Sequence, residues 1–274
     1  MAETGREAAE TERFRLEGRV ALLTGAAGHF GAAMAPALNG AGAHVVLGGR
    51  SADKLEALRL RLPDPARATV VPFDVGDPEA CRSVVERIGG ELGRLDVIVN
   101  NAYSGRAVPL EEAEADDFVR GYQVAVAGPF QLVRFALPLL KEAGSRHRGG
   151  ASIVNVGSMY GSVSPDPGVY GESGMNNPPF YGAAKAGLHQ LTRYLACHLA
   201  PWNVRVNCIA PGPFPPDRVG DDHPEFAAAL RGKVPLGRLG HPGELVGPLL
   251  FLASDASSYV TGAVLPVDGG WTAW

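Results

Sequence analysis

Short runs of almost uninterrupted hydrophobic residues recur along the chain, separated by longer segments in which apolar positions return every three or four residues. The runs are rich in valine, isoleucine and leucine and do not alternate with polar residues, which is typical of strands buried on both faces of a parallel sheet. Seven such strands are predicted, at residues 19–24, 43–49, 68–75, 95–102, 151–158, 203–210 and 262–270.

The segments between the strands have the spacing of amphipathic helices, most clearly at 78–92, 116–140, 181–199 and 242–253. Because strand and helix alternate, the sequence predicts an α/β fold. We expect a single doubly wound Rossmann-type domain with a seven-stranded, mainly parallel sheet and helices on both faces. The first fifteen residues are polar and rich in glutamate, so 1–15 is predicted to be a disordered tail and 16–274 the domain.

Composition narrows the possible partners. The formal net charge of −4 leaves no basic surface that would attract nucleic acid. No run reaches the ~20 consecutive apolar residues of a membrane-spanning helix. The three cysteines, Cys81, Cys197 and Cys208, have spacings that suit neither a metal site nor a disulfide framework. We therefore expect a cytoplasmic protein that acts on a small-molecule substrate, with no metal and with neither nucleic acid nor membrane as a partner.

A glycine-rich turn follows the first predicted strand, where TGAAGHFG (24–31) opens a helix. Glycines allow the backbone to approach a pyrophosphate, and the helix N-terminus offers N–H groups and a positive dipole end to it. Glycine also ends strands for ordinary turn reasons, so the motif gains its weight from this setting. The candidate phosphate-binding residues are Gly25, Gly28, His29, Phe30 and Gly31.

The end of the second strand indicates which dinucleotide binds. An NAD site usually places an acidic side chain there for the ribose 2′-hydroxyl, but this sequence has Gly49 followed by Arg50. The Arg50 guanidinium can pair with a 2′-phosphate, which favours NADP(H) over NAD(H), although a solvated surface arginine is the alternative. After the third strand, Asp74, with Val75 beside it, is placed to accept from the adenine amino group. Capping of the next helix is the competing role, and Asp77 suits it better.

Tyr181 and Lys185 stand four residues apart on a predicted helix and so share one face. A tyrosine with a pKa near ~10 is a poor base at neutral pH, but a neighbouring ammonium favours the phenolate. Lys185 is therefore expected to lower the pKa of Tyr181. Ser158, at the end of the fifth strand, can donate to a substrate oxygen as charge develops there. A tyrosine and a lysine four residues apart more often lie on an ordinary helix surface, so this assignment depends on the other motifs around them.

Together these motifs resemble the short-chain dehydrogenase/reductase family over about residues 15 to 271. The matching motifs, in order, are TGAAGHFG (24–31), NNA (100–102), GS (157–158), YGAAK (181–185) and APG (210–212). The resemblance implies that Ser158 polarises a carbonyl, Tyr181 acts as general acid and base, and Lys185 binds the nicotinamide ribose. It also implies further cofactor-binding residues along the path to the nicotinamide: Asn100, Asn101, Ala102, Tyr181, Lys185, Pro211, Gly212 and Phe214.

The sequence departs from this family's pattern in four places. His29 occupies the position of the middle glycine of the turn, and Pro216 replaces a threonine that often contacts the nicotinamide amide. Ala125 stands where an asparagine usually completes a proton relay. Gln123 cannot replace it, because two positions along a helix turn a side chain by ~200°. Finally, the segment between Ser158 and Tyr181 is longer than usual.

The extra segment, 162–180, directly precedes the catalytic tyrosine and is expected to border the substrate. It resembles a subgroup tied to bacterial surface-sugar and flagellin-modification pathways. Tyr103 and Tyr160 can stack on a substrate ring, with packing inside the protein as the alternative. The segment 213–233 is expected to form a substrate flap. Polar side chains of the extra segment suit a hydroxylated substrate: Asp166, Tyr170, Glu172, Ser173, Asn176 and Asn177.

The sequence thus predicts an NADP(H)-dependent oxidoreductase that interconverts a carbonyl and a secondary alcohol on a sugar- or polyol-like substrate. A 3-oxoacyl-type reductase is an alternative. A catalytically weak NADP-binding regulatory protein is another, motivated by Ala125 and the altered glycine turn. Relatives of this kind pair their long helices, so a homotetramer or homodimer is expected through 116–140 and 181–199.

Overall fold

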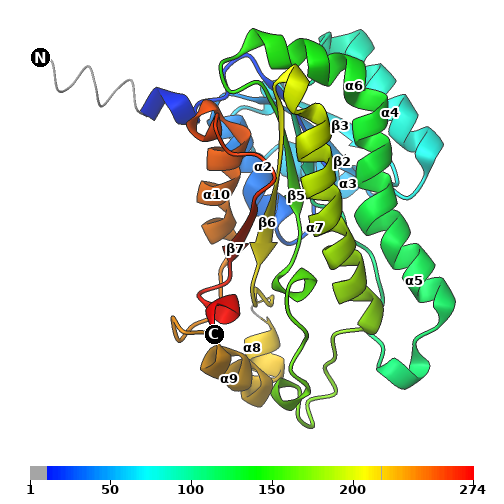
Figure 1. Cartoon of the computed structure of the whole chain (residues 1–274), viewed down its shortest axis with the longest axis vertical. Coiled ribbons are helices and arrows are strands. Elements are labelled where there is room, and N and C mark those ends of the chain that lie inside the picture. The colour runs from blue at the N-terminus through cyan, green and yellow to red at the C-terminus, as the bar shows by residue number, and fades with distance from the viewer. Residues whose placement is uncertain (1–10, 217) are drawn as a thin grey trace, which may run out of the picture.

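A single parallel sheet forms the centre of the molecule (Figure 1). The computed structural model describes residues 11–216 and 218–274. Its strand order is β3-β2-β1-β4-β5-β6-β7, and every neighbouring pair is parallel. The predicted seven-stranded doubly wound sheet is therefore confirmed. The strands are β1 Val20–Leu23, β2 His44–Gly49, β3 Ala68–Pro72, β4 Val97–Asn100, β5 Ala151–Val156, β6 Val204–Pro211 and β7 Val264–Val267.

Helices cover both faces of the sheet and form two hydrophobic clusters with it. Side chains of β1 alternate between them: Ala21 and Leu23 join the cluster under α2, α3 and α10, whereas Val20 and Leu22 join the one under α4, α6 and α7. Each strand is thus buried on both sides, which explains the uninterrupted apolar runs. The helices are α2 Gly31–Gly40, α3 Ala52–Arg59, α4 Pro78–Leu92, α5 Ala115–Tyr122, α6 Gly128–Arg146, α7 Pro179–Leu199, α8 Arg218–Asp222, α9 Pro224–Lys233 and α10 Val246–Ala253.

The helix predicted at 116–140 is longer and less regular than its pattern indicates. It runs from Ala115 to Arg146 as α5 and α6, joined by a π-helical turn at Gln123–Ala127. Among the described residues it is the one helix long and apolar enough, by length and composition, to cross a bilayer. Core helices pass the same test, and α6 here packs on the sheet and α4 through Leu132 and Leu140.

The structure describes only parts of the predicted tail, 1–15, and of the predicted flap, 213–233. Residues 1–10 of the predicted tail lie outside the described residues, and Glu12–Phe14 form a 3₁₀ helix. Leu16, the first residue of the predicted domain, is fully buried. In the segment 213–233, α8 and α9 are helical, and residue 217 lies outside the described residues.

Candidate active site

The turn between β1 and α2 requires glycine at two positions. Gly25 has a φ of +63°, and a Cβ there would lie 2.9 Å from the Cα of Ala102. A Cβ on Gly31 would lie 2.3 Å from the Gly25 carbonyl oxygen, a distance that no side chain tolerates. Gly28 is less restricted, since its Cβ would meet that oxygen at 3.1 Å. The turn therefore holds the N-terminus of α2 close to the carboxyl end of β1, where the positive end of the helix dipole favours an anion.

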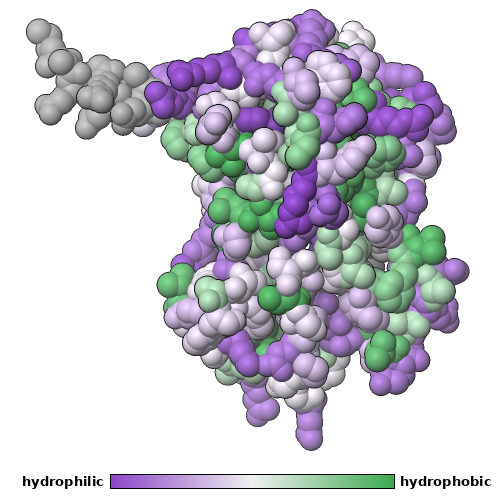
Figure 2. Space-filling view, in the orientation of Figure 1, coloured by the Kyte–Doolittle hydropathy of each residue, from purple (hydrophilic) through white to green (hydrophobic). Residues whose placement is uncertain are grey.

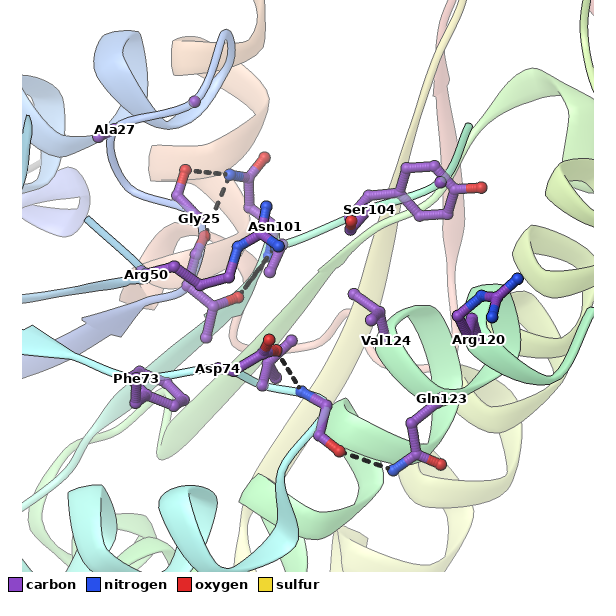
Figure 3. Close-up of a pocket in the computed structure, with 18 of the residues that line it drawn as sticks. Gly25, Ala27, Arg50, Phe73, Asp74, Asn101, Ser104, Arg120, Gln123 and Val124 are labelled. Atoms are coloured by element: carbon purple, nitrogen blue, oxygen red, sulfur yellow. Dashed lines mark hydrogen bonds between the residues drawn. The ribbon is translucent and has the colours of Figure 1, made fainter. Parts of the chain in front are cut away.

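Hydrogen bonds from Asn101 fix this turn against the end of β4. Its amide nitrogen Nδ2 donates to the carbonyl oxygens of Thr24 and Gly25, at 3.1 and 3.0 Å (Figure 3). The Thr24 hydroxyl accepts from the backbone N–H groups of Asn101 and Ala102. Sequence reasoning missed Thr24, although it opens the TGAAGHFG motif. These hydrogen bonds hold the glycine turn against the residues that follow β4.

A cleft of about 1210 Å³ lies at the carboxyl ends of β1 to β4, where a doubly wound sheet binds its ligand. Figure 3 shows Arg50 and Asp74 in one part of it and Ser104 and Arg120 in another. Many predicted cofactor residues line the cleft: Gly25, Gly28, His29, Phe30, Arg50, Asp74, Val75, Asn101 and Ala102. Others from the same prediction do not line it: Gly31, Tyr181, Lys185, Pro211, Gly212 and Phe214.

Arg50 is exposed at the end of β2 on the cleft wall. Within residues 11–216 and 218–274 it makes no hydrogen bond or ion pair, so its guanidinium is available to an anion. Ser51 and Lys54 line the cleft next to it, and sequence reasoning missed both. Lys54 could have been found from its place in the first turn of the helix that directly follows Arg50. This corner of the cleft therefore carries two cationic side chains.

The structure assigns the capping role to Asp77 and not to Asp74. Asp77 accepts from the N–H groups of Glu79 and Ala80 at the start of α4, as predicted. Asp74 is exposed on the cleft wall, where its carboxylate accepts from the Gly76 N–H at 2.9 Å. Gln123 donates to the Gly76 carbonyl oxygen, which confirms that it does not take over the position of Ala125.

Ser158, Tyr181 and Lys185 meet beside the cleft. Ser158 follows β5, and its hydroxyl accepts from the Tyr160 N–H at 3.1 Å. On α7, the ammonium nitrogen of Lys185 lies 5.8 Å from the centroid of the Tyr181 ring and donates to the Val156 carbonyl oxygen at 2.7 Å. Helical spacing and the end of a buried strand are sufficient to bring the three groups together.

Lys185 was expected to lower the pKa of Tyr181, but in the structure the pKa of Tyr181 is raised. Burial raises the pKa of Tyr181, and a hydrogen bond from Ser158 offsets only part of that rise. Lys185 is itself buried, which lowers its pKa to about 8, and its ammonium is directed to the Val156 carbonyl. The phenol is therefore protonated at neutral pH. That state can donate a proton, as carbonyl reduction requires, whereas oxidation requires its removal.

Tyr103, which follows the NNA motif, packs against both of these residues. Its ring meets the Tyr181 ring edge-to-face, with centroids 5.0 Å apart at 85°. The Lys185 ammonium lies 5.2 Å from the centroid of the Tyr103 ring. Tyr103 also packs against the small hydrophobic cluster that contains Ala125.

The segment after β6 is joined to the glycine turn. A Cβ on Gly212 would lie 2.6 Å from the Cα of Asp268, so glycine is required there too. Phe214 is packed edge-to-face on Phe30, and its carbonyl oxygen lies 3.1 Å from Nε2 of His29. His29, predicted near the phosphates, thus also contacts the first residues of the expected flap.

The extra segment 162–180 is a packed unit. Val169 joins Phe226, Leu230 and Trp271 in a small hydrophobic cluster of its own. Most of the polar side chains expected to face a substrate have internal partners: Asp166 pairs with Lys233, Tyr170 stacks on Phe226, Ser173 donates to the Tyr170 carbonyl and Asn176 to the Val108 carbonyl. Composition alone did not reveal these partners.

The site combines a glycine turn at α2, a cleft at the strand ends and an adjoining serine, tyrosine and lysine. This combination is that of a dinucleotide-dependent oxidoreductase. The chain matches the family described as Enoyl-(Acyl carrier protein) reductase over residues 25–272. It belongs to the short-chain dehydrogenase/reductase family, and its curated relatives include reductases and dehydrogenases that act on CH–OH groups.

Curated relatives and solved structures cover nearly the whole chain. The 3-oxoacyl-[acyl-carrier-protein] reductase FabG of Thermotoga maritima is 37% identical, over 93% of this chain and 98% of the relative. Galactitol 2-dehydrogenase of Cereibacter sphaeroides is 34% identical, over 95% and 98%. The gluconate 5-dehydrogenase of Burkholderia cenocepacia, solved with NADP and tartrate, aligns with a TM-score of 0.84 and 31% identity, over 96% and 98%.

Proposed function

We propose that this protein is an NADP(H)-dependent oxidoreductase that interconverts a carbonyl and a secondary alcohol on a polar, sugar- or polyol-like substrate. The observation that carries the proposal is the meeting of Ser158, Tyr181 and Lys185 beside the cleft. A general acid that is protonated at neutral pH, with a hydroxyl donor next to it, is what carbonyl reduction needs.

The residues around the cleft fit a dinucleotide. The close approach of backbone at Gly25 and Gly31 leaves space for a pyrophosphate at the start of α2, and Asp74 is exposed where the adenine would lie. Arg50 and Lys54 would hold a 2′-phosphate. The residues assigned to the nicotinamide end are Pro211, Gly212 and Phe214, by resemblance to the family.

The bound nicotinamide would supply the hydride in reduction and accept it in oxidation. Ser158 donates a hydrogen bond to the substrate oxygen as negative charge grows on it. Tyr181 gives its proton to that oxygen, so the product alcohol gains one hydride on carbon and one proton on oxygen. Lys185 would hold the ribose hydroxyls of the bound cofactor and so position the nicotinamide ring beside the Tyr181 phenol. In place of an amide at Ala125, water or a substrate hydroxyl returns the proton to Tyr181.

Replacing Arg50 with alanine is expected to raise the KM for NADPH about tenfold or more and to change the KM for NADH little. The reason is that the guanidinium is free of other partners and only NADPH carries the 2′-phosphate. Initial rates with both cofactors test this. Arg61→Ala, at an exposed arginine just beyond α3 that does not line the cleft, is the matched control. Equal changes for the two cofactors would contradict the phosphate role of Arg50.

Two observations favour a hydroxylated substrate. Galactitol and gluconate dehydrogenases are among the similar proteins. In addition, Oδ1 of Asn177, two residues before α7 begins, is buried and has no partner among the described residues, so it is available to accept from a hydroxyl. The 3-oxoacyl reductase alternative is supported by the FabG relative. The surface-sugar subgroup remains a prediction.

A panel of sugars, polyols and acyl β-ketoesters, assayed with NADPH or NADP, separates these possibilities. We expect turnover at 340 nm with keto-sugars or polyols and much lower kcat/KM with the acyl compounds, because galactitol and gluconate dehydrogenases are among the similar proteins and Oδ1 of Asn177 lacks a partner. The reverse order would favour the 3-oxoacyl reductase. Tight NADPH binding without consumption across the panel would favour the regulatory protein, for which Ala125 gives a reason.

Apolar side chains are exposed on α5 and α7, including Phe118, Val119, Tyr122 and Tyr194. Figure 2 shows this apolar surface over the α5 region. Burial of such surface between copies supports a homodimer or homotetramer. A cytoplasmic location, with no membrane or nucleic acid partner, accords with the acidic net charge.

A further inference from the structure

The side chain of Tyr103 separates the cleft from the catalytic pair. Tyr103 lines the cleft, whereas Tyr181 and Lys185 do not. Its ring stands edge-to-face on Tyr181, with centroids 5.0 Å apart, and lies 5.2 Å from the Lys185 ammonium. A ligand that fills the cleft therefore meets Tyr103 before it meets either catalytic side chain.

Lys185 cannot reach a ribose hydroxyl while this ring is in place. Lys185 is buried, with only 4% of the residue exposed. On one side it donates to the Val156 carbonyl oxygen at 2.7 Å, and on another it faces the Tyr103 ring. Contact between Lys185 and a ribose, which the proposed function requires, needs the ring to move.

The hydroxyl of Tyr103 makes this position costly. It is buried and has no hydrogen-bond partner among the described residues. It fits only because residue 105 is glycine: a Cβ there would lie 2.6 Å from the hydroxyl oxygen and 3.1 Å from the ring carbon that bears it. A buried polar group without a partner destabilises the arrangement that encloses it. The ring contacts therefore favour the closed position while the hydroxyl opposes it.

We propose that Tyr103 controls the entry of the nicotinamide riboside to Tyr181 and Lys185. In the free protein the ring rests on the catalytic pair. When the dinucleotide binds, the ring leaves, the riboside takes its place against Lys185, and the phenol hydroxyl gains a partner. This inference rests on the proposed use of NADP(H).

Substitutions at Tyr103 and Gly105 should shift the balance between the closed and the open position of the Tyr103 ring. Tyr103→Phe keeps the ring but removes the unpartnered hydroxyl, so the closed position gains stability and NADPH should bind about fivefold more weakly. Gly105→Ala places a methyl group where the hydroxyl now lies, and its backbone φ is not in the left-handed region. It should displace the ring and make NADPH bind faster and more tightly. Tyr103→Ala, which removes the ring, should also speed association.

The experiment is a fluorescence titration and stopped-flow binding of NADPH to the full chain and these variants, with thermal melting to check folding. Adenosine 2′,5′-bisphosphate, which lacks the nicotinamide riboside, is the control ligand. Its affinity should be the same for all variants. The role of Tyr103 would be overturned if Tyr103→Phe and the two alanine variants all changed NADPH binding in the same direction. Equal changes in the affinity for adenosine 2′,5′-bisphosphate would overturn it as well. Failure of the unmodified protein to bind NADPH at all would instead overturn the proposed cofactor.

Discussion

Tyr181→Phe is expected to lower kcat by about 10²- to 10⁴-fold, the range that a positioned general acid contributes. Phenylalanine fills the same space and keeps the ring contact with Tyr103, so NADPH affinity should change less than about threefold, because only a hydroxyl is lost. Initial rates in both directions, together with an NADPH titration, measure the two effects separately.

The matched control for Tyr181 is on the same helix. Tyr194→Phe also removes a phenol hydroxyl from α7, but Tyr194 is 60% exposed and lies more than two helical turns beyond Lys185. It should leave kcat unchanged. If Tyr181→Phe kept most of the activity, another group would have to supply the proton and the assignment of Tyr181 would be wrong.

Gly31→Ala should lower both cofactor affinity and stability. The added methyl group would lie 2.3 Å from the Gly25 carbonyl oxygen and 2.5 Å from that of Ala26, so the turn and the start of α2 must separate. Overpacking of this kind costs about 1–3 kcal/mol. We expect a lower melting temperature and a Kd for NADPH raised at least about tenfold, because the helix N-terminus that is proposed to hold the pyrophosphate moves with the turn.

Calorimetric titration and thermal unfolding of the same samples test this prediction. Gly90→Ala is the control, because Gly90 is in the interior of α4 and a Cβ there meets nothing within 4 Å. Alanine also favours a helix over glycine, so this variant should be as stable as the unmodified protein or more so. Unchanged NADPH binding by Gly31→Ala would mean that the turn does not form the phosphate site.

Much of the fold could be predicted because its determinants are local. Strands buried on both faces need unbroken apolar runs, and strand–helix alternation leaves few topologies. The π-helical turn at Gln123–Ala127 could not be predicted, since one extra residue in a turn hardly alters an apolar pattern. Asp77 could be recognised as the cap because its role depends on the residues that follow it directly.

The candidate site was predictable where spacing determines geometry and unpredictable where packing does. Tyr181 and Lys185 share a helix face by their spacing alone. By contrast, the position of Tyr103 depends on contacts with α7 and on the glycine at 105, which are remote or easily overlooked in sequence. The pKa of Tyr181 is likewise set by burial that the sequence does not display.

The small cluster around Val169, Phe226 and Trp271 has a consequence for how this protein can change over time. It joins the extra segment to α9 and the C-terminal residues, and it is separate from the two clusters that hold the sheet. Substitutions there can reshape the region before Tyr181 while the strands and the dinucleotide turn keep their packing. Under the proposal that the extra segment borders the substrate, substrate preference can therefore evolve, or be engineered, without disturbing the packing of the sheet.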